Sequence, residues 1–67
     1  MDREKILQIV NQDPAGFLAK VNVCKRVEMQ ICDKKCVFIR NHIKGGVEVF
    51  CDGFWIHLKL NGVWACD

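Results

Sequence analysis

Apolar and polar residues alternate along the last third of the chain, and two turn signals interrupt the alternation. Asp52-Gly53 and Asn61-Gly62 tolerate the positive φ angles of a two-residue type I′ turn, so each dipeptide predicts a β-hairpin. The two turns also fix which residues face each other across the strands. The predicted pairs are Cys51 with Phe54, Val49 with Ile56, Val47 with Leu58, Leu60 with Val63 and Leu58 with Ala65, and all are apolar.

A further hairpin is predicted over residues 26–40, where the period is again two. Val27, Met29 and Ile31 fall on one side of the first strand, and a three-residue turn over residues 33–35 leads into the second. This turn predicts three pairs that agree in polarity and charge: Ile31 with Val37, Met29 with Ile39, and Glu28 with Arg40.

The first third of the chain is expected to be at least partly helical. Asp2 is a suitable N-cap for a helix from about Arg3 to Asn11, which carries an apolar stripe. Asp13-Pro14 is a second helix start signal, with proline at the first helical position. Residues 17–23 also alternate as a strand would, so the sequence leaves residues 14–24 open between helix and strand. We favour a short helix or turn that leads into a strand.

Together these elements predict a single α+β domain over residues 1–67. A helical part covers about residues 2–24, and a four- to five-stranded antiparallel β-meander, on which the N-terminal helix packs, covers about residues 26–66. A fifth strand over residues 17–23 is one option. The predicted core comprises Val27, Met29, Ile31, Val37, Ile39, Val47, Val49, Ile56, Leu58, Leu60 and Val63.

The second face of the sheet is too apolar for an ordinary solvated surface. Its expected residues combine aromatic rings with cations, as do hot spots of protein interfaces and platforms that stack single-stranded nucleic acids. The hairpin registers place Glu48, Phe50, Trp55, His57, Lys59, Trp64 and Cys66 on this face, with Phe38 and Arg40 on the same side. The candidate partner-binding residues are Phe38, Arg40, Phe50, Trp55, His57, Lys59 and Trp64.

Composition supports a face that meets a partner. Hydrophobic residues make up 51% of only 67 residues, more than one small core can hide, which favours a homodimer. The net charge is only +2. Residues 20–44 hold seven basic and two acidic side chains, whereas one basic and three acidic side chains follow from residue 45 on. This basic end would permit nucleic-acid contact without requiring it.

Catalysis is not expected. The chain lacks Ser, Thr and Tyr, which excludes hydroxyl nucleophiles and a tyrosine acid. The predicted register aligns Glu48, His57 and Cys66 in one row, an arrangement that could activate a cysteine nucleophile. However, an open sheet offers no oxyanion hole, and Cys66 is the penultimate residue.

No metal or other cofactor is expected either. The cysteines and histidines could supply zinc ligands, but their spacing does not converge on one site: Cys24, Cys32, Cys36, His42, Cys51, His57 and Cys66. A Cys32–Cys36 disulfide or redox pair remains an alternative. An odd number of cysteines favours a reducing compartment.

The sequence therefore predicts a small non-enzymatic protein-interaction module that docks its aromatic sheet face, or an exposed edge strand, on a partner. It would act as an inhibitor or regulator, as small phage and plasmid proteins often do. Its partner would be a protein, which includes a second copy of the chain. Single-stranded nucleic-acid or RNA binding is the alternative, and a cysteine-dependent enzyme is third. No apolar stretch reaches the roughly 18 residues that span a bilayer, and no signal peptide is evident, so we expect a cytoplasmic protein without membrane contact.

Overall fold

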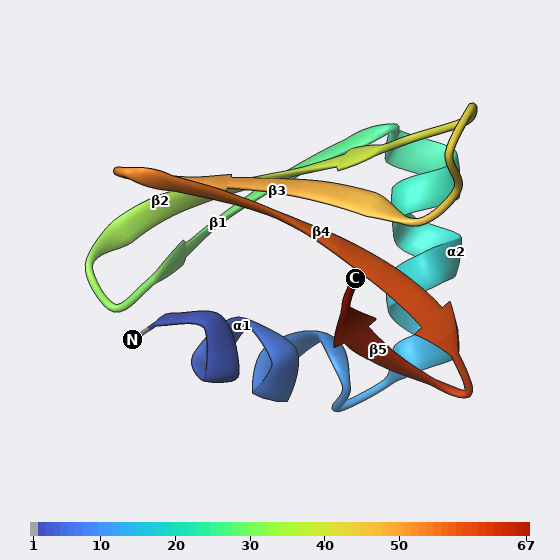
Figure 1. Ribbon diagram of the computed structural model, residues 1–67, viewed down its shortest axis with the longest axis horizontal. Coiled ribbons are helices and arrows are strands. Elements are labelled where there is room, and N and C mark those ends of the chain that lie inside the picture. Colours follow the sequence, from blue (N-terminus) through green and yellow to red (C-terminus); the bar gives the residue numbers. More distant parts are fainter. Residues whose placement is uncertain (1) are drawn as a thin grey trace.

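The computed structural model describes residues 2–67, in which two helices precede one five-stranded antiparallel sheet (Figure 1). The strands follow the meander order β1-β2-β3-β4-β5, which confirms the predicted α+β fold. The predicted cap, the Asp2 side chain, lies outside the described part. The elements are α1 (Asp2–Val10), α2 (Pro14–Cys24), β1 (Arg26–Ile31), β2 (Lys34–Arg40), β3 (Val47–Cys51), β4 (Phe54–Asn61) and β5 (Val63–Cys66).

Residues 14–24 form a helix, so the prediction of a strand over residues 17–23 was wrong. The Asp13 carboxylate accepts a hydrogen bond from the Gly16 backbone N–H at 3.1 Å, and Pro14 opens the first turn. Phe17 and Val21, one helical turn apart, are buried, whereas Val23 is exposed. The helical period therefore decides which side chains reach the core. Within residues 2–67, no helix is long and apolar enough to cross a membrane.

The sheet curves around the two helices, and its concave face holds the core (Figure 1). Helix α1 contacts both edge strands, β1 and β5, while α2 packs on β1 and β2. The buried hydrophobic residues are Ile6, Val10, Phe17, Val21, Val27, Ile31, Cys36, Phe38, Val47, Val49, Cys51, Ile56, Leu58 and Trp64.

The β3–β4 hairpin has the predicted register. Val47, Val49 and Cys51 face Leu58, Ile56 and Phe54. Of the two turn residues only Gly53 has a positive φ, so the predicted type I′ turn was wrong, although the predicted turn length was right. All of these strand residues except Phe54 are buried, and Phe54 packs against the core. The Asp52-Gly53 turn signal therefore determined this part of the sheet correctly.

The β1–β2 hairpin differs from its predicted register. Cys32 and Asp33 form a two-residue turn with φ angles of 53° and 63°, and Ile31 faces Lys34. Both lysines of the expected turn therefore belong to β2. Because the pairing shifts by an odd number of residues, every β2 side chain changes face. The predicted pairs Ile31–Val37, Met29–Ile39 and Glu28–Arg40 were wrong for this reason.

The shift exchanges the β2 residues of the predicted core. Phe38 is fully buried on the concave face, and its ring packs edge-to-face on Phe17 with centroids 5.2 Å apart. Val37 and Ile39, expected in the core, lie on the other face and are half-buried. A large aromatic ring thus takes the place of two aliphatic side chains against α2.

The β4–β5 hairpin is shifted by one residue. Asn61 faces Val63 around Gly62, so Leu60 faces Trp64 and Leu58 faces Cys66. The predicted pairs Leu60–Val63 and Leu58–Ala65 were wrong, and Val63 is exposed rather than part of the core. The slip moves Trp64 from the expected second face to the concave face.

Trp64 is anchored on both helices. Its ring packs edge-to-face on Phe17 at 5.7 Å, and its indole N–H donates to the Pro14 carbonyl at 3.2 Å. The Asn11 side chain accepts from the Trp64 backbone N–H at 2.7 Å and donates to its carbonyl at 3.0 Å. These contacts explain why the shifted register is preferred over the predicted one.

A disulfide joins Cys36 of β2 to Cys51 of β3 inside the core. The alternative Cys32–Cys36 disulfide or redox pair was therefore wrong, because Cys32 occupies the β1–β2 turn. Cys24, Cys32 and Cys66 are free and exposed.

The loop from residue 41 to residue 46 folds back toward β4. The Asn41 side chain accepts hydrogen bonds from the backbone N–H groups of Ile43 and Lys44, and the Asn41 backbone bonds to both Gly45 and Gly46. Gly46 has a φ of +75°, and a Cβ there would collide with the Leu58 carbonyl. A glycine is required at this point, where the loop backbone touches β4.

We expect the disulfide to contribute about 3 kcal/mol to stability, the value for a closed loop of about 15 residues. Urea unfolding with and without reductant measures this contribution. Thiol titration of the folded, unreduced protein should find three free thiols. In the Cys36→Ala/Cys51→Ala double variant, reductant should have no effect. Five reactive thiols in the untreated protein would contradict the assignment.

We expect Gly46→Ala to be markedly more destabilising than Gly45→Ala. Both residues have positive φ, which costs an alanine about 1–2 kcal/mol, but a Cβ at Gly45 meets nothing within 4 Å. The collision at Gly46 should therefore add about 2 kcal/mol, measured by urea unfolding. Equal losses in the two variants would show that the loop does not press on β4.

Candidate functional site

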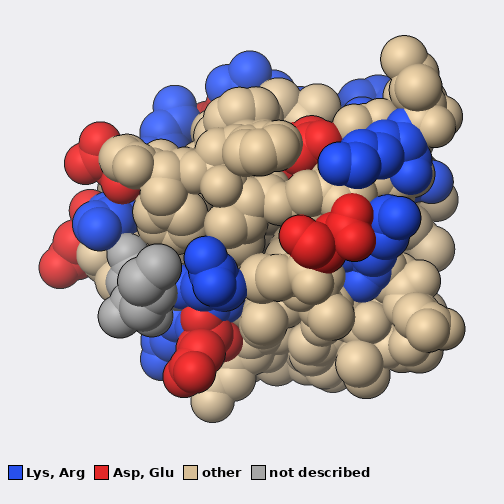
Figure 2. All heavy atoms as spheres, viewed as in Figure 1, with Lys and Arg blue, Asp and Glu red and all other residues tan. Residues whose placement is uncertain are grey.

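The convex face of the sheet, here called the outer face, points away from the helices and is the candidate site. Its side chains follow from the observed register of β2 to β5. Figure 2 shows this side of the molecule, where uncharged atoms cover broad areas between scattered charged side chains. The outer face comprises Val37, Ile39, Glu48, Phe50, Trp55, His57, Lys59 and Ala65.

Four of these residues, Val37, Ile39, Phe50 and Trp55, form what we call the apolar patch. Val37 faces Phe50, and Phe50 faces Trp55 across three strands. The centroids of the Phe50 and Trp55 rings lie 6.4 Å apart. Phe50 is 44% exposed and Trp55 is 53% exposed. The patch thus presents two large aromatic side chains to solvent without a covering helix.

Charged residues border the apolar patch at its β1 end. Glu28 binds Arg26 at 2.8 Å and Lys35 at 3.1 Å. Hydrogen bonds from Lys35 and Arg26, together with their positive charge, lower the pKa of Glu28. All three side chains are solvent-exposed, so this cluster contributes little to stability and mainly defines the charge of the margin.

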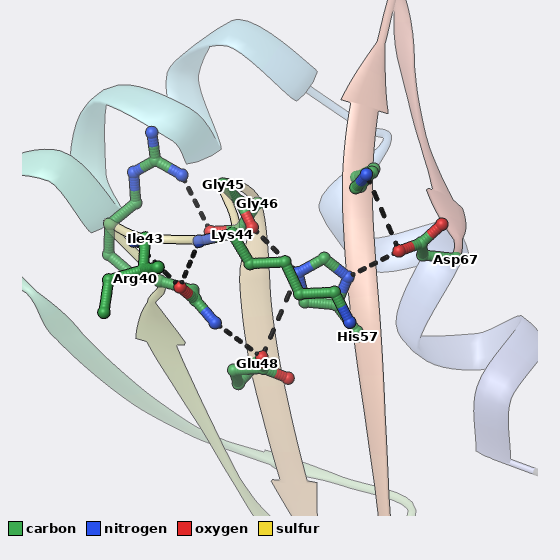
Figure 3. A network of polar contacts seen from close by, with 10 residues as sticks. Arg40, Ile43, Lys44, Gly45, Gly46, Glu48, His57 and Asp67 are labelled. Atoms are coloured by element: carbon green, nitrogen blue, oxygen red, sulfur yellow. Dashed lines mark hydrogen bonds and ion pairs between the residues drawn. The ribbon is translucent and has the colours of Figure 1, made fainter.

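A buried imidazole forms the centre of a polar network at the other end of the outer face (Figure 3). His57 is only 5% exposed. Its Nε2 lies 2.8 Å from the Gly45 carbonyl and 4.0 Å from Glu48, and its Nδ1 lies 3.2 Å from the Asp67 carboxylate. Lys59 approaches the same Asp67 oxygen at 3.7 Å.

The contacts of His57 connect the 41–46 loop to the last residue of the chain and so stabilise the fold. Nε2 faces the Gly45 carbonyl and Nδ1 faces the Asp67 carboxylate, so each ring nitrogen has a polar partner. The ring links the 41–46 loop to residue 67, and Cys66, the thiol predicted beside it, faces Leu58 instead. Glu48 is held by Asn41 at 2.8 Å, and its other carboxylate oxygen is buried without a partner among the described residues.

The predicted row of Glu48, His57 and Cys66 was wrong in its third member. Glu48 faces His57 as expected, but Cys66 faces Leu58. The Asp67 backbone N–H donates to the His57 carbonyl at 2.9 Å, so Asp67 takes the place opposite His57. The one-residue slip at Gly62 is the physical reason, and it separates the only aligned thiol from the imidazole.

The structure brings some predicted partner-binding residues together and separates others. Phe50 and Trp55 are adjacent on the outer face, and His57 and Lys59 follow on the same strand. Phe38 and Trp64 are in the core, so the prediction that they share this face was wrong; the shifted registers bury them. Arg40 also lies on the helix side, bonded to Asn22 and Gly46.

Two clefts that the sequence analysis did not predict flank the 41–46 loop. One, about 390 Å³, lies beside Trp55 and is lined by Arg3, Lys44, Trp55, Ile56, His57, Cys66 and Asp67. The other, about 330 Å³, is here called the α2–loop cleft and is lined by Leu18, Arg40, Lys44, Gly45, Gly46, Lys59, Leu60 and Trp64. The Gly45-Gly46 pair marked a loop in the sequence, but only the fold brings residues 18 and 60 beside it.

Among residues 2–67, no three His, Cys, Asp or Glu side chains are grouped closely enough to hold an ion. The outer face and the two clefts therefore carry the functional inference. No family model, no curated protein and no solved structure matches this chain.

Proposed function

We propose that the chain is a small non-enzymatic interaction module that docks its apolar patch on a partner protein and acts as an inhibitor or regulator. The observation that carries the proposal is the half-exposed pair Phe50 and Trp55 on a face that no helix covers. Aromatic side chains are enriched among the residues that dominate binding energy at protein interfaces. For so small a domain, keeping these two aromatic side chains exposed to water would be unfavourable.

The face is a better docking surface than either sheet edge. At β5, the Asn11 side chain already bonds the outward N–H and carbonyl of Trp64. At β1, Arg26 and Glu28 are exposed, and charged side chains on an edge strand oppose pairing with another chain. Strand addition is therefore disfavoured at both edges.

Single-stranded nucleic-acid binding is the second candidate. Phe50 and Trp55 could stack on bases, and Arg26 and Lys35 stand at the margin of the patch. The platform is smaller than the sequence suggested, because Phe38 and Trp64 are buried. Both marginal cations also pair with Glu28, which reduces their attraction for phosphates.

A cytoplasmic location is part of the proposal, because secreted small domains rarely leave three cysteines free. The Cys36–Cys51 disulfide instead favours an oxidising compartment. The number of free thiols in protein isolated from its native cells, with thiols blocked during lysis, distinguishes a reducing cytoplasm from an oxidising compartment.

We expect Trp55→Ala to weaken partner binding by about 2 kcal/mol, because it removes an aromatic side chain at the interface. The measurement is quantitative capture of proteins from native lysate, with and without nuclease, followed by titration of the purified partner. Nuclease should not matter for a protein partner, and binding should depend only weakly on salt.

Ile43→Ala is the matched control, since Ile43 is fully exposed but lies on the loop away from the apolar patch. It should bind like the unmodified chain. If folded Trp55→Ala retains full affinity, the patch is not the docking surface. Loss of capture after nuclease treatment, with a steep salt dependence, would favour the nucleic-acid alternative instead.

We also propose that a second copy of the chain is one partner of this face, giving a homodimer. Sedimentation equilibrium of the purified chain should show dimers in the micromolar range, and Trp55→Ala should shift them toward monomers because Trp55 would be buried between copies. Monomers alone over that range would exclude self-association.

A further inference from the structure

The α2–loop cleft lies on the helix side of the 41–46 loop, apart from the apolar patch. Helix α2 contributes Leu18, the loop contributes Lys44, Gly45 and Gly46, and strand β4 contributes Lys59 and Leu60. Its volume of about 330 Å³ is at the lower end for pockets that hold small molecules. The cleft is therefore large enough for a compact ligand and too small for a folded partner.

The charged side chains that line this cleft are all basic. Arg40 is held in place because its Nε donates to Asn22 at 2.9 Å and its Nη1 donates to the Gly46 carbonyl at 2.7 Å. Lys44 and Lys59 are the other charged residues, and no Asp or Glu lines the cleft. The Lys59 ammonium lies 3.7 Å from the Asp67 carboxylate, which a competing anion can displace.

The remaining lining is apolar and rigid. Leu18 and Leu60 are half-buried and pack against the core, and Trp64 is only 2% exposed. The Trp64 indole is fixed by its hydrogen bond to the Pro14 carbonyl and by its contact with Phe17. An apolar floor that does not need to rearrange reduces the entropic cost of binding a ring or short aliphatic group.

We propose that the α2–loop cleft binds a small organic anion, in which a phosphate or carboxylate lies among Arg40, Lys44 and Lys59 and an apolar group lies on Leu18, Leu60 and Trp64. The charged group gains charge-assisted hydrogen bonds from these cations, and at Lys59 it takes the place of the Asp67 carboxylate. Attachment to an apolar body distinguishes the ligand from a free inorganic anion.

Binding at this site also involves the 41–46 loop, because Lys44, Gly45 and Gly46 line the cleft and belong to this loop. The Gly45 carbonyl accepts from His57 on the opposite side of the loop. A ligand in the cleft would therefore hold the loop in the position in which it covers His57, and ligand binding should raise the stability of the whole chain.

The test is an NMR titration of the full chain with phenyl phosphate and phenylacetate as probes. Inorganic phosphate and benzyl alcohol supply the anion and the ring separately. Either organic anion should give saturable shifts in the Gly45 and Gly46 amides and in the Trp64 indole N–H. The Gly53 amide, in the β3–β4 turn and outside both clefts, serves as an internal reference that should not move.

Lys44→Gln and Lys59→Gln should each weaken probe binding by about tenfold, the usual effect of removing a charged hydrogen-bond donor. The matched control is Lys20→Gln, which removes an exposed charge from α2 outside the cleft. It should leave affinity unchanged.

The proposal is overturned if neither organic anion gives saturable shifts, or if Lys20→Gln weakens binding as much as the cleft variants. Equal affinity for inorganic phosphate would show that the apolar floor contributes nothing, and equal affinity for benzyl alcohol would show that the cations contribute nothing. Shifts confined to the Trp55 indole would place the binding on the outer face instead.

Discussion

Trp64 is the residue on which the arrangement of both faces depends. It belongs to the shortest strand, yet its side chain contacts Phe17 and Pro14 and its backbone bonds to Asn11, so it connects β5 to α2 and to the end of α1. Burying an indole with its N–H satisfied is strongly favourable. This preference sets the register of β5, and the register in turn places Asp67 opposite His57 and leaves Cys66 opposite Leu58.

The same anchoring divides the outer face into two parts of different character. Near the end of β5, Asp67, Glu48 and the 41–46 loop surround His57 and exclude it from solvent. Toward β1 and β2, nothing in the described chain covers Phe50 and Trp55. A polar network whose groups mostly bond to one another gains little from a partner, whereas an exposed aromatic pair gains free energy from one. The apolar patch is for this reason the part of the face to which we assign binding.

Small size explains why so many residues of the chain serve to stabilise the fold. A domain of 67 residues has a limited core, and here a disulfide between β2 and β3 crosses that core. The side chains of Arg40 and Asn41 form hydrogen bonds with backbone groups of the 41–46 loop and hold it in place. The α2–loop cleft arises where this fixed loop, α2 and β4 meet, so its basic lining is held by the same contacts that stabilise the fold.

The sequence by itself determined the α+β class, the meander and the β3–β4 register. Asp52-Gly53 closes a two-residue turn, and the length of this turn alone fixes which residues pair across β3 and β4, whichever turn type forms. Phe50, Trp55 and the Glu48–His57 pair were placed correctly because they depend on this turn alone.

Only the tertiary structure decided the other two hairpins and the helix over residues 14–24. Cys32-Asp33 is no obvious turn, and Asn61-Gly62 permits more than one register, so local preference was too weak to choose. The choice depended on which side chains the helices could bury, namely Phe38 and Trp64 against Phe17. Such contacts join residues about 20 to 50 positions apart, and a pattern of period two carries no information about them.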